Sequence, residues 1–95
     1  MLDGGMVETT VVVQHREGLH ARLAARLVQT ANQFKQTVIR IGKDAREVNA
    51  KSIVGVLTLG IGQGAEVRLC AEGAEAEQAL AALETLIRSN FGEEL

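Results

Sequence analysis

The apolar residues of this 95-residue chain follow two different periods, and the two periods alternate along the sequence. Residues 66–72 alternate strictly between polar and apolar, which is typical of a strand with one buried face. The side chains expected to face inward are Val67, Leu69 and Ala71. Residues 74–90 instead carry leucine and isoleucine at intervals of three and four, which predicts an amphipathic helix. A chain with both patterns can bury its apolar residues by packing helices on one face of a sheet.

Three further segments are predicted to be strands, because β-branched residues are frequent in them. They are residues 6–13, 37–41 and 45–49. The last two flank Gly42-Lys43-Asp44, which has the length and the residue types of a hairpin turn. We therefore expect these two strands to pair antiparallel.

Two segments remain as candidate helices. From Ala21 the apolar residues recur with helical spacing over three to four turns. Residues 51–59 are ambiguous, because their β-branched content favours a strand whereas Ser52 is a good N-cap for a short helix. Taking this stretch as a helix gives the order β-α-β-β-α-β-α. That order indicates a two-layer α/β (α+β) sandwich formed by a single domain over residues 1–95.

Composition and charge argue against several classes of function. The formal net charge is −2 and the only aromatic residues are two Phe, so direct nucleic-acid binding is disfavoured. The single cysteine, Cys70, cannot form an internal disulfide, which favours a reducing cytoplasm. The apolar runs are too short for membrane insertion, and no long apolar sheet edge demands a dimer. We expect a cytoplasmic monomer that needs no cofactor.

The segment Gly18-Leu19-His20-Ala21-Arg22 has the clearest chemical meaning, because a glycine turn brings a histidine to the first residues of a helix. The first turn of a helix leaves backbone N–H groups unpaired and carries partial positive charge, so an anion attached to the imidazole would be stabilised there. The guanidinium of Arg22 can bind a phosphate through two parallel hydrogen bonds. The alternative is that His20 only occupies an N-cap-like position and that Arg22 is a solvated surface residue.

His15 lies in the polar loop before Gly18 and is expected to be a surface residue. A metal site shared by His15 and His20 is the alternative interpretation. No carboxylate or cysteine completes a recognisable ligand set, so we expect no metal site.

The segment around His20 resembles the active-site signature and first helix of HPr, the histidine-containing phosphocarrier protein of the bacterial phosphoenolpyruvate:sugar phosphotransferase system. The matching residues are Gly18-Leu19-His20-Ala21-Arg22, Ala24-Ala25 and residues 27–31. Residues 48–56 (VNAKSIVGV) resemble the regulatory-serine segment of the same family, and the similarity runs from about Val7 to Ser89. The resemblance implies an open-faced sandwich of four antiparallel strands with three helices on one face.

The resemblance also implies roles for particular residues. His20 would be phosphorylated by enzyme I through ring atom Nδ1 and discharged to enzyme IIA domains in sugar uptake, while Arg22 would stabilise the phosphoryl group. In this role the chain is a carrier and not an enzyme. Ser52 would be phosphorylated by HPr kinase/phosphorylase, which weakens docking to enzyme I and in some bacteria creates a corepressor for a catabolite-control transcription factor.

One residue departs from the family pattern, which has proline where this chain has Leu23. Proline presets the backbone of a first helical turn, so we expect altered transfer kinetics and partner choice. We expect Leu23 to leave an additional backbone N–H at the phosphate-facing end of the helix. We also expect an apolar docking patch there. Hydrophobicity alone would place Ile53, Val54 and Leu57 in the core. The resemblance favours exposure of Ile53 and Val54, and burial and exposure of Leu57 stay equally open. The patch consists of Leu23, Ile53, Val54 and Leu57, with Arg22 and Arg26 at its rim.

Other functions stay open at this point. A regulatory HPr paralogue would act mainly as a protein-binding module in carbon or nitrogen control through Ser52, but such a protein has no need of His20. A carrier for a nitrogen-regulatory branch or for a dihydroxyacetone kinase system belongs to the same class as the first hypothesis. A small ferredoxin-like RNA-binding domain is disfavoured by the charge and by the missing aromatic residues.

Overall fold

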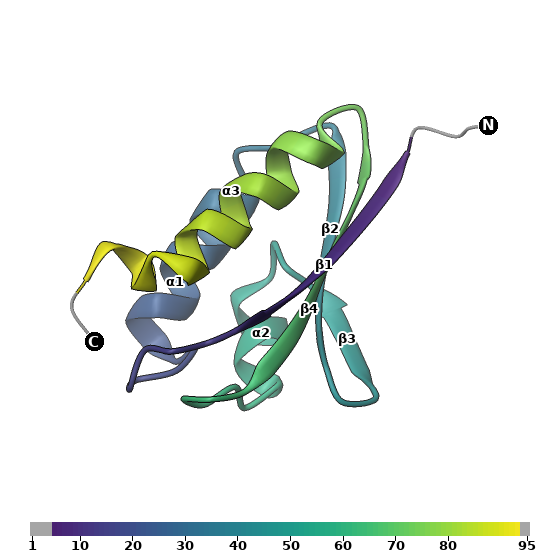
Figure 1. Cartoon of the computed structure of the whole chain (residues 1–95). Helices are drawn as coiled ribbons and strands as arrows, with labels where there is room; N and C mark the ends of the chain where they lie inside the picture. Colours follow the sequence, from purple (N-terminus) through teal and green to yellow (C-terminus); the bar gives the residue numbers. More distant parts are fainter. Residues whose placement is uncertain (1–4, 94–95) are drawn as a thin grey trace.

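The computed structural model describes residues 5–93, so the ends of the predicted domain, 1–95, lie outside the described residues. The predicted order of strands and helices is confirmed (Figure 1). The elements are β1 (Met6–Val12), α1 (Ala21–Ala31), β2 (Thr37–Lys43), β3 (Arg46–Asn49), α2 (Ile53–Thr58), β4 (Glu66–Gly73), α3 (Ala76–Arg88) and the short 3₁₀ helix η1 (Asn90–Gly92). The ambiguous stretch 51–59 contains a helix, because the Ser52 hydroxyl caps α2 by accepting a hydrogen bond from the Gly55 N–H (3.1 Å).

The four strands form one antiparallel sheet in the order β1-β4-β2-β3. β2 and β3 pair as the predicted hairpin, and β4 pairs with both β1 and β2. The alternation predicted for β4 is confirmed, since Val67, Leu69 and Ala71 are fully buried. Arg68 is exposed and Cys70 is half-buried on the opposite face of the strand.

The helices cover one face of the sheet and leave the other face open (Figure 1). Aliphatic residues from both layers fill the space between them, and α3 contributes Ala79, Leu80, Leu83 and Ile87. This is the open-faced sandwich that the resemblance implied. Among residues 5–93, every helix is too short or too polar to pass through a bilayer.

Leu23 belongs to the core and not to the surface. It shares one stripe of α1 with Ala24, Leu27 and Ala31, and its side chain is fully buried. Residues four apart on a helix lie on the same face, so the position of Leu23 follows from that of Leu27. The prediction that Leu23 forms part of an exposed docking patch is therefore wrong.

The loop before α1 is pressed against the segment that precedes β4. Gly18 has a φ of +68°, and a side chain there would collide with the backbone carbonyl of Ile61. The adjacent Leu19 N–H donates to the same carbonyl oxygen (2.8 Å), and the Leu19 side chain is fully buried. Gly18 is needed here for both its left-handed backbone and its close approach, and together these contacts set the position of His20.

After α3 the chain reverses through a short left-handed turn. Asn90, Phe91 and Gly92 have φ values of 59°, 59° and 73°. Two of these residues are not glycine, so the turn is strained, and burial of the Phe91 ring (1% exposed) holds it in place. The turn directs the next residue, Glu93, back to the start of α1, where it contacts Arg22.

Candidate functional site

His20 is the N-cap residue of α1, and its side chain is exposed. Its backbone is extended (φ −113°, ψ 160°), and its side chain makes no capping hydrogen bond. Within the described residues, the backbone N–H groups of Ala21 and Arg22 have no hydrogen-bond acceptor. Ala21 itself has a φ of 30°, which is strained for a residue with a side chain. An exposed imidazole thus stands beside two unpaired donors at the positive end of a helix dipole.

The N–H of Leu23 is not one of these free donors. It donates to the His20 carbonyl oxygen (2.9 Å), as does the N–H of Ala24 (3.2 Å). The prediction that replacing the family proline leaves an additional N–H for a phosphate is therefore wrong. The additional N–H of Leu23 instead fastens the first turn of α1 to His20.

Arg22 is half exposed and is held by two carboxylates. Its guanidinium donates to both oxygens of Glu93, from Nη1 to Oε2 and from Nη2 to Oε1 (3.2 Å). Nη2 also donates to Oε2 of Glu17 (2.9 Å). The hydrogen bonds with Glu93, followed by the hydrogen bond with Glu17, raise the pKa of Arg22 above its ordinary value. The arginine is thus near His20 in sequence but is already paired in the unphosphorylated protein.

Glu93 is the residue on which this network converges. Its hydrogen bonds with Arg22, and secondly with His15, lower the pKa of the Glu93 carboxyl from 4.5 to about 2. Arg26 lies 3.5 Å from Oε2 of the same carboxylate. Glu93 therefore stays ionised at neutral pH and is surrounded by two arginines and a histidine.

His15 is buried, so the prediction that it is a surface loop residue is wrong. Its Nδ1 accepts a hydrogen bond from the Glu17 N–H (3.1 Å), which leaves Nε2 to donate to Oε1 of Glu93 (2.9 Å). The ring also meets the Phe91 ring edge-on, with centroids 6.4 Å apart. The expectation of a surface residue fails because the segment that covers His15 comes from the far end of the chain. Within residues 5–93, no group of three or more His, Cys, Asp or Glu is arranged to hold a metal ion.

Arg26 fastens the turn that carries Glu93. Its Nη1 donates to the Phe91 carbonyl oxygen (2.6 Å), and its guanidinium lies 6.0 Å from the centre of the Phe91 ring. Its predicted contribution to a docking patch stays a prediction, but part of its guanidinium is already engaged within the protein.

The second predicted site lies at the start of α2, which packs beside α1. Ser52 is half-buried as the N-cap, and the large side chains that follow it face solvent. Ile53 is 39% exposed, Val54 69% and Leu57 40%, so the predicted exposure of Ile53 and Val54 is confirmed, and Leu57, for which burial was equally expected, is exposed as well. Their role as a docking surface stays a prediction.

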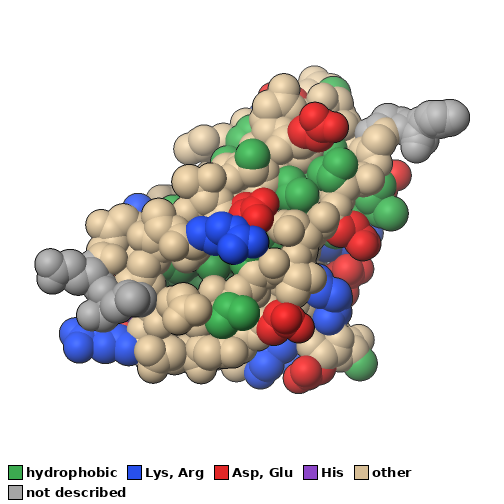
Figure 2. All heavy atoms as spheres, viewed as in Figure 1, with side chains coloured by type: hydrophobic (Ala, Val, Ile, Leu, Met, Phe, Trp, Pro, Cys, Tyr) green, Lys and Arg blue, Asp and Glu red, His purple; other side chains and the backbone are tan. Residues whose placement is uncertain are grey.

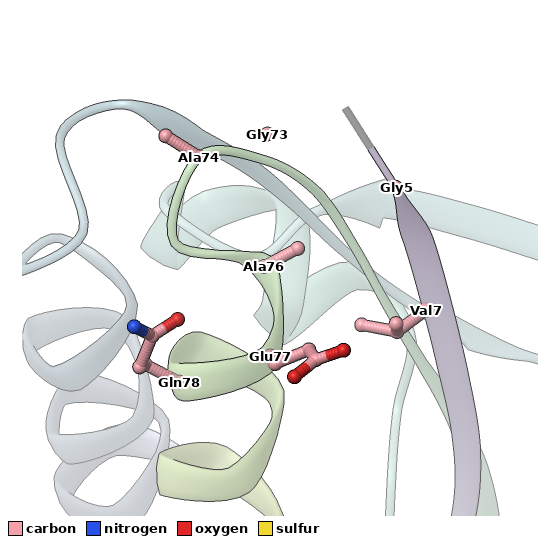
Figure 3. Close-up of a pocket in the computed structure, with 7 residues that line it drawn as sticks. All are labelled: Gly5, Val7, Gly73, Ala74, Ala76, Glu77 and Gln78. Carbon is pink, nitrogen blue, oxygen red and sulfur yellow. The ribbon is translucent and has the colours of Figure 1, made fainter. Parts of the chain in front are cut away.

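A cavity of about 330 Å³ lies at the N-terminal start of α3 (Figure 3). It is bordered by Gly73 and Ala74 after β4, and the Glu77 and Val7 side chains approach each other across it. Glu93 follows the opposite end of α3. The cavity therefore plays no part in the site at His20.

Comparison with known proteins assigns the family. A sequence model of the family described as PTS HPr component phosphorylation site matches residues 7–89. The chain belongs to the HPr family. Phosphocarrier protein HPr of Treponema pallidum (strain Nichols) is 44% identical over 89 residues, which cover 94% of this chain and all of that protein. The HPr-like protein Crh of Halalkalibacterium halodurans is 46% identical over 78 residues, which cover 82% and 92% of the two chains.

A solved structure agrees with this assignment. The crystal structure of HPr-C-His from Thermoanaerobacter tengcongensis has a TM-score of 0.90 and 50% sequence identity, covering 94% of this chain and 99% of that one. The resemblance seen in the sequence and the predicted fold are thereby confirmed. As a member of the HPr family, the chain has the general role of a phosphocarrier in the phosphotransferase system.

The ion pairs of Glu93 predict a dependence of stability on pH. Because the pKa of Glu93 in the folded protein is lowered from 4.5 to about 2, the pairs stabilise the fold above pH 4.5, and this stabilisation is lost as the pH falls from 4.5 to about 2. We expect Glu93→Gln to lose less stability than wild type over this interval when thermal unfolding midpoints are measured against pH. Coincident pH profiles for the two proteins would contradict the ion-pair network.

Proposed function

We propose that this HPr-family chain carries a phosphoryl group on His20, which it accepts from enzyme I and passes to enzyme IIA domains in the cytoplasm. The observation that carries the proposal is the exposed N-cap position of His20, with unpaired N–H groups on the two residues that follow. A ring nitrogen without a proton attacks phosphorus, and the bond between phosphorus and its donor breaks as the new N–P bond forms. The electron pair of the broken bond leaves with the donor.

The surroundings of His20 suit a carrier. The two free N–H groups and the helix dipole favour the negative charge of the phosphoryl group, and the Arg22 guanidinium on the same helical turn can add a charge-assisted hydrogen bond. The His20 side chain is exposed, so a partner protein can reach the group that it carries. Moderate stabilisation suits a group that must be handed on.

The proposal is tested by incubating the protein with phosphoenolpyruvate and enzyme I and measuring its intact mass. We expect a gain of one phosphoryl group that is lost in acid and retained in alkali. Addition of an enzyme IIA domain should remove it. If the wild-type chain gained no phosphoryl group under conditions in which a related HPr is fully phosphorylated, the proposal would be contradicted.

A second phosphorylation, at Ser52, would regulate docking. Its hydroxyl lies at the N-terminal end of α2, where the helix dipole favours added negative charge, and the exposed Ile53 and Val54 follow directly. A phosphate there would place about two negative charges beside this apolar surface. We propose that HPr kinase/phosphorylase carries out this step, which weakens docking to enzyme I and prepares the surface for a catabolite-control transcription factor.

Replacing Ser52 by alanine is expected to have two effects. Loss of the N-cap should lower the free energy of unfolding by about 1 kcal/mol, measured by chemical denaturation. It should also abolish the acid-stable phosphate that HPr kinase/phosphorylase and ATP introduce. Ser89→Ala is the matched control because Ser89 is the only other serine, and it should keep the phosphate. If HPr kinase/phosphorylase still phosphorylated Ser52→Ala, the regulatory proposal would be contradicted.

The regulatory-paralogue alternative predicts a different pattern. Such a protein would bind its partner through the Ser52 surface and would gain no phosphoryl group from enzyme I. Similarity to the HPr-like protein Crh keeps this alternative open. The His20 side chain is exposed and makes no capping hydrogen bond, which favours the phosphocarrier function.

A further inference from the structure

His15 is buried (3% exposed) at the beginning of the turn that leads to His20. The turn spans residues 15–18, and its backbone is closed by the hydrogen bond from the Gly18 N–H to the His15 carbonyl oxygen (2.9 Å). The imidazole closes the same turn a second time, because its Nδ1 accepts the Glu17 N–H (3.1 Å). A side-chain acceptor that binds the N–H two residues ahead is a recurring way of holding a turn. The turn is therefore held by one backbone bond and one side-chain bond.

The orientation of the His15 ring is set by residues from the far end of the chain. Nε2 donates to Oε1 of Glu93 (2.9 Å), so the ring proton lies on Nε2 and Nδ1 is free to accept. The Phe91 ring meets the imidazole edge-on. Together these two contacts keep Nδ1 directed at the Glu17 N–H.

The end of the turn leads directly to the nucleophile. Gly18 lies against the Ile61 carbonyl, and the Leu19 N–H donates to the same oxygen (2.8 Å). His20 comes next, and its side chain makes no capping hydrogen bond, so the backbone sets the position of its imidazole. Loosening the turn at residues 15–17 would change the direction in which Gly18 enters this contact, and His20 would move with it.

We infer that His15 is a positioning residue for phosphoryl transfer, whose Nδ1 holds the turn of residues 15–18 in the form that presents His20 to the donor. The inference rests on the proposed function. His15 itself forms no bond to phosphorus, since its ring is buried and both of its nitrogens are engaged. It acts through geometry, because a displacement of the nucleophile by about 1 Å is enough to slow a transfer reaction strongly.

The test compares two substitutions that each keep the function of one ring nitrogen. His15→Asn puts an amide oxygen near the place of Nδ1, so it still accepts the Glu17 N–H, but it is too short to reach Glu93. His15→Gln reaches Glu93 with its amide nitrogen and leaves the Glu17 N–H without its acceptor. Both remove the ring and its contact with Phe91, so the two variants form a matched pair.

The rate of transfer from phosphorylated enzyme I is measured in single turnovers by rapid quenching, at rising concentrations of each variant. We expect His15→Gln to lower the maximal rate about five- to tenfold, the equivalent of one hydrogen bond. The half-saturating concentration should stay unchanged, because the α2 residues proposed for docking are intact. His15→Asn should keep the maximal rate to within about twofold of wild type.

Glu84→Gln is the control for a surface change remote from the turn. Glu84 pairs with Arg88 on α3 (2.8 Å), where acidic and basic side chains lie together on the surface (Figure 2). The substitution should leave both the maximal rate and the half-saturating concentration unchanged. Thermal unfolding midpoints establish that each variant is folded at the assay temperature.

Nuclear magnetic resonance of the ¹⁵N-labelled wild type tests the geometry without a substitution. We expect the His15 proton on Nε2 and a scalar coupling between Nδ1 and the Glu17 amide nitrogen across their hydrogen bond. A proton on Nδ1 would overturn the inference, and so would equal maximal rates for His15→Asn and His15→Gln. Either result leaves His20 as the carrier site. A wild type that enzyme I cannot phosphorylate would overturn the proposed function and the inference with it.

Discussion

A protein with His20→Gln is expected to accept no phosphoryl group from enzyme I, so the mass gain should fall from one phosphoryl group per chain to none. Glutamine has no nitrogen able to attack phosphorus, and the other histidine, His15, is buried with both ring nitrogens hydrogen-bonded. The side chain of His20 is exposed and makes no capping hydrogen bond, so the fold should be unaffected.

The measurement is intact mass after incubation with phosphoenolpyruvate and enzyme I, with the thermal unfolding midpoint recorded beside it. Glu84→Gln serves as the folded and fully active control, since its carboxylate pairs only with Arg88 on α3 among the described residues. If the His20→Gln variant were still phosphorylated, another residue of the chain would have to be the nucleophile.

Replacing Leu23 by alanine is expected to lower the free energy of unfolding by about 2–5 kcal/mol, the usual cost of opening a cavity at a fully buried leucine. The side chain sits in the buried stripe of α1, directly after Arg22. Its loss should loosen the first helical turn, which supplies the unpaired N–H groups beside His20. Chemical denaturation monitored by circular dichroism measures the effect.

Leu57→Ala is the matched control for Leu23→Ala, because it removes the same atoms from a leucine that is 40% exposed. Its cost should be about 1 kcal/mol or less. Equal losses for the two variants would mean that Leu23 is not packed in the core as described.

The fold could be predicted from the sequence because its elements depend on local patterns. Strict alternation in residues 66–72 and helical spacing in 74–90 placed β4 and α3 correctly, with small differences at their ends. The stretch 51–59 was ambiguous, because its β-branched residues and its Ser52 cap favour different structures. The cap determines the outcome, because the Gly55 N–H lies in the first turn of α2, where the helix offers it no backbone acceptor, and the serine hydroxyl accepts its hydrogen bond.

The candidate site was predicted only where it is local. His20 and Ser52 lie at helix starts that can be recognised from a few neighbouring residues. The Glu93 contacts could not be found in this way, since His15 and Glu93 are 78 residues apart and no motif joins them. The same missing contact explains why His15 was expected at the surface. The burial of Leu23 is, by contrast, a local feature, because its spacing of four from Leu27 places both side chains on the same face of α1.

The central claim is that His20 carries the phosphoryl group, and nuclear magnetic resonance of the phosphorylated protein tests it most directly. With ¹⁵N-labelled histidine, the coupling between phosphorus and ring nitrogen identifies the modified residue among the two histidines of the chain. We expect phosphorus on Nδ1 of His20, and a His15 ring that carries none. The account would be contradicted if phosphorus were bound to His15, or if the His20 ring were unmodified in the fully phosphorylated protein.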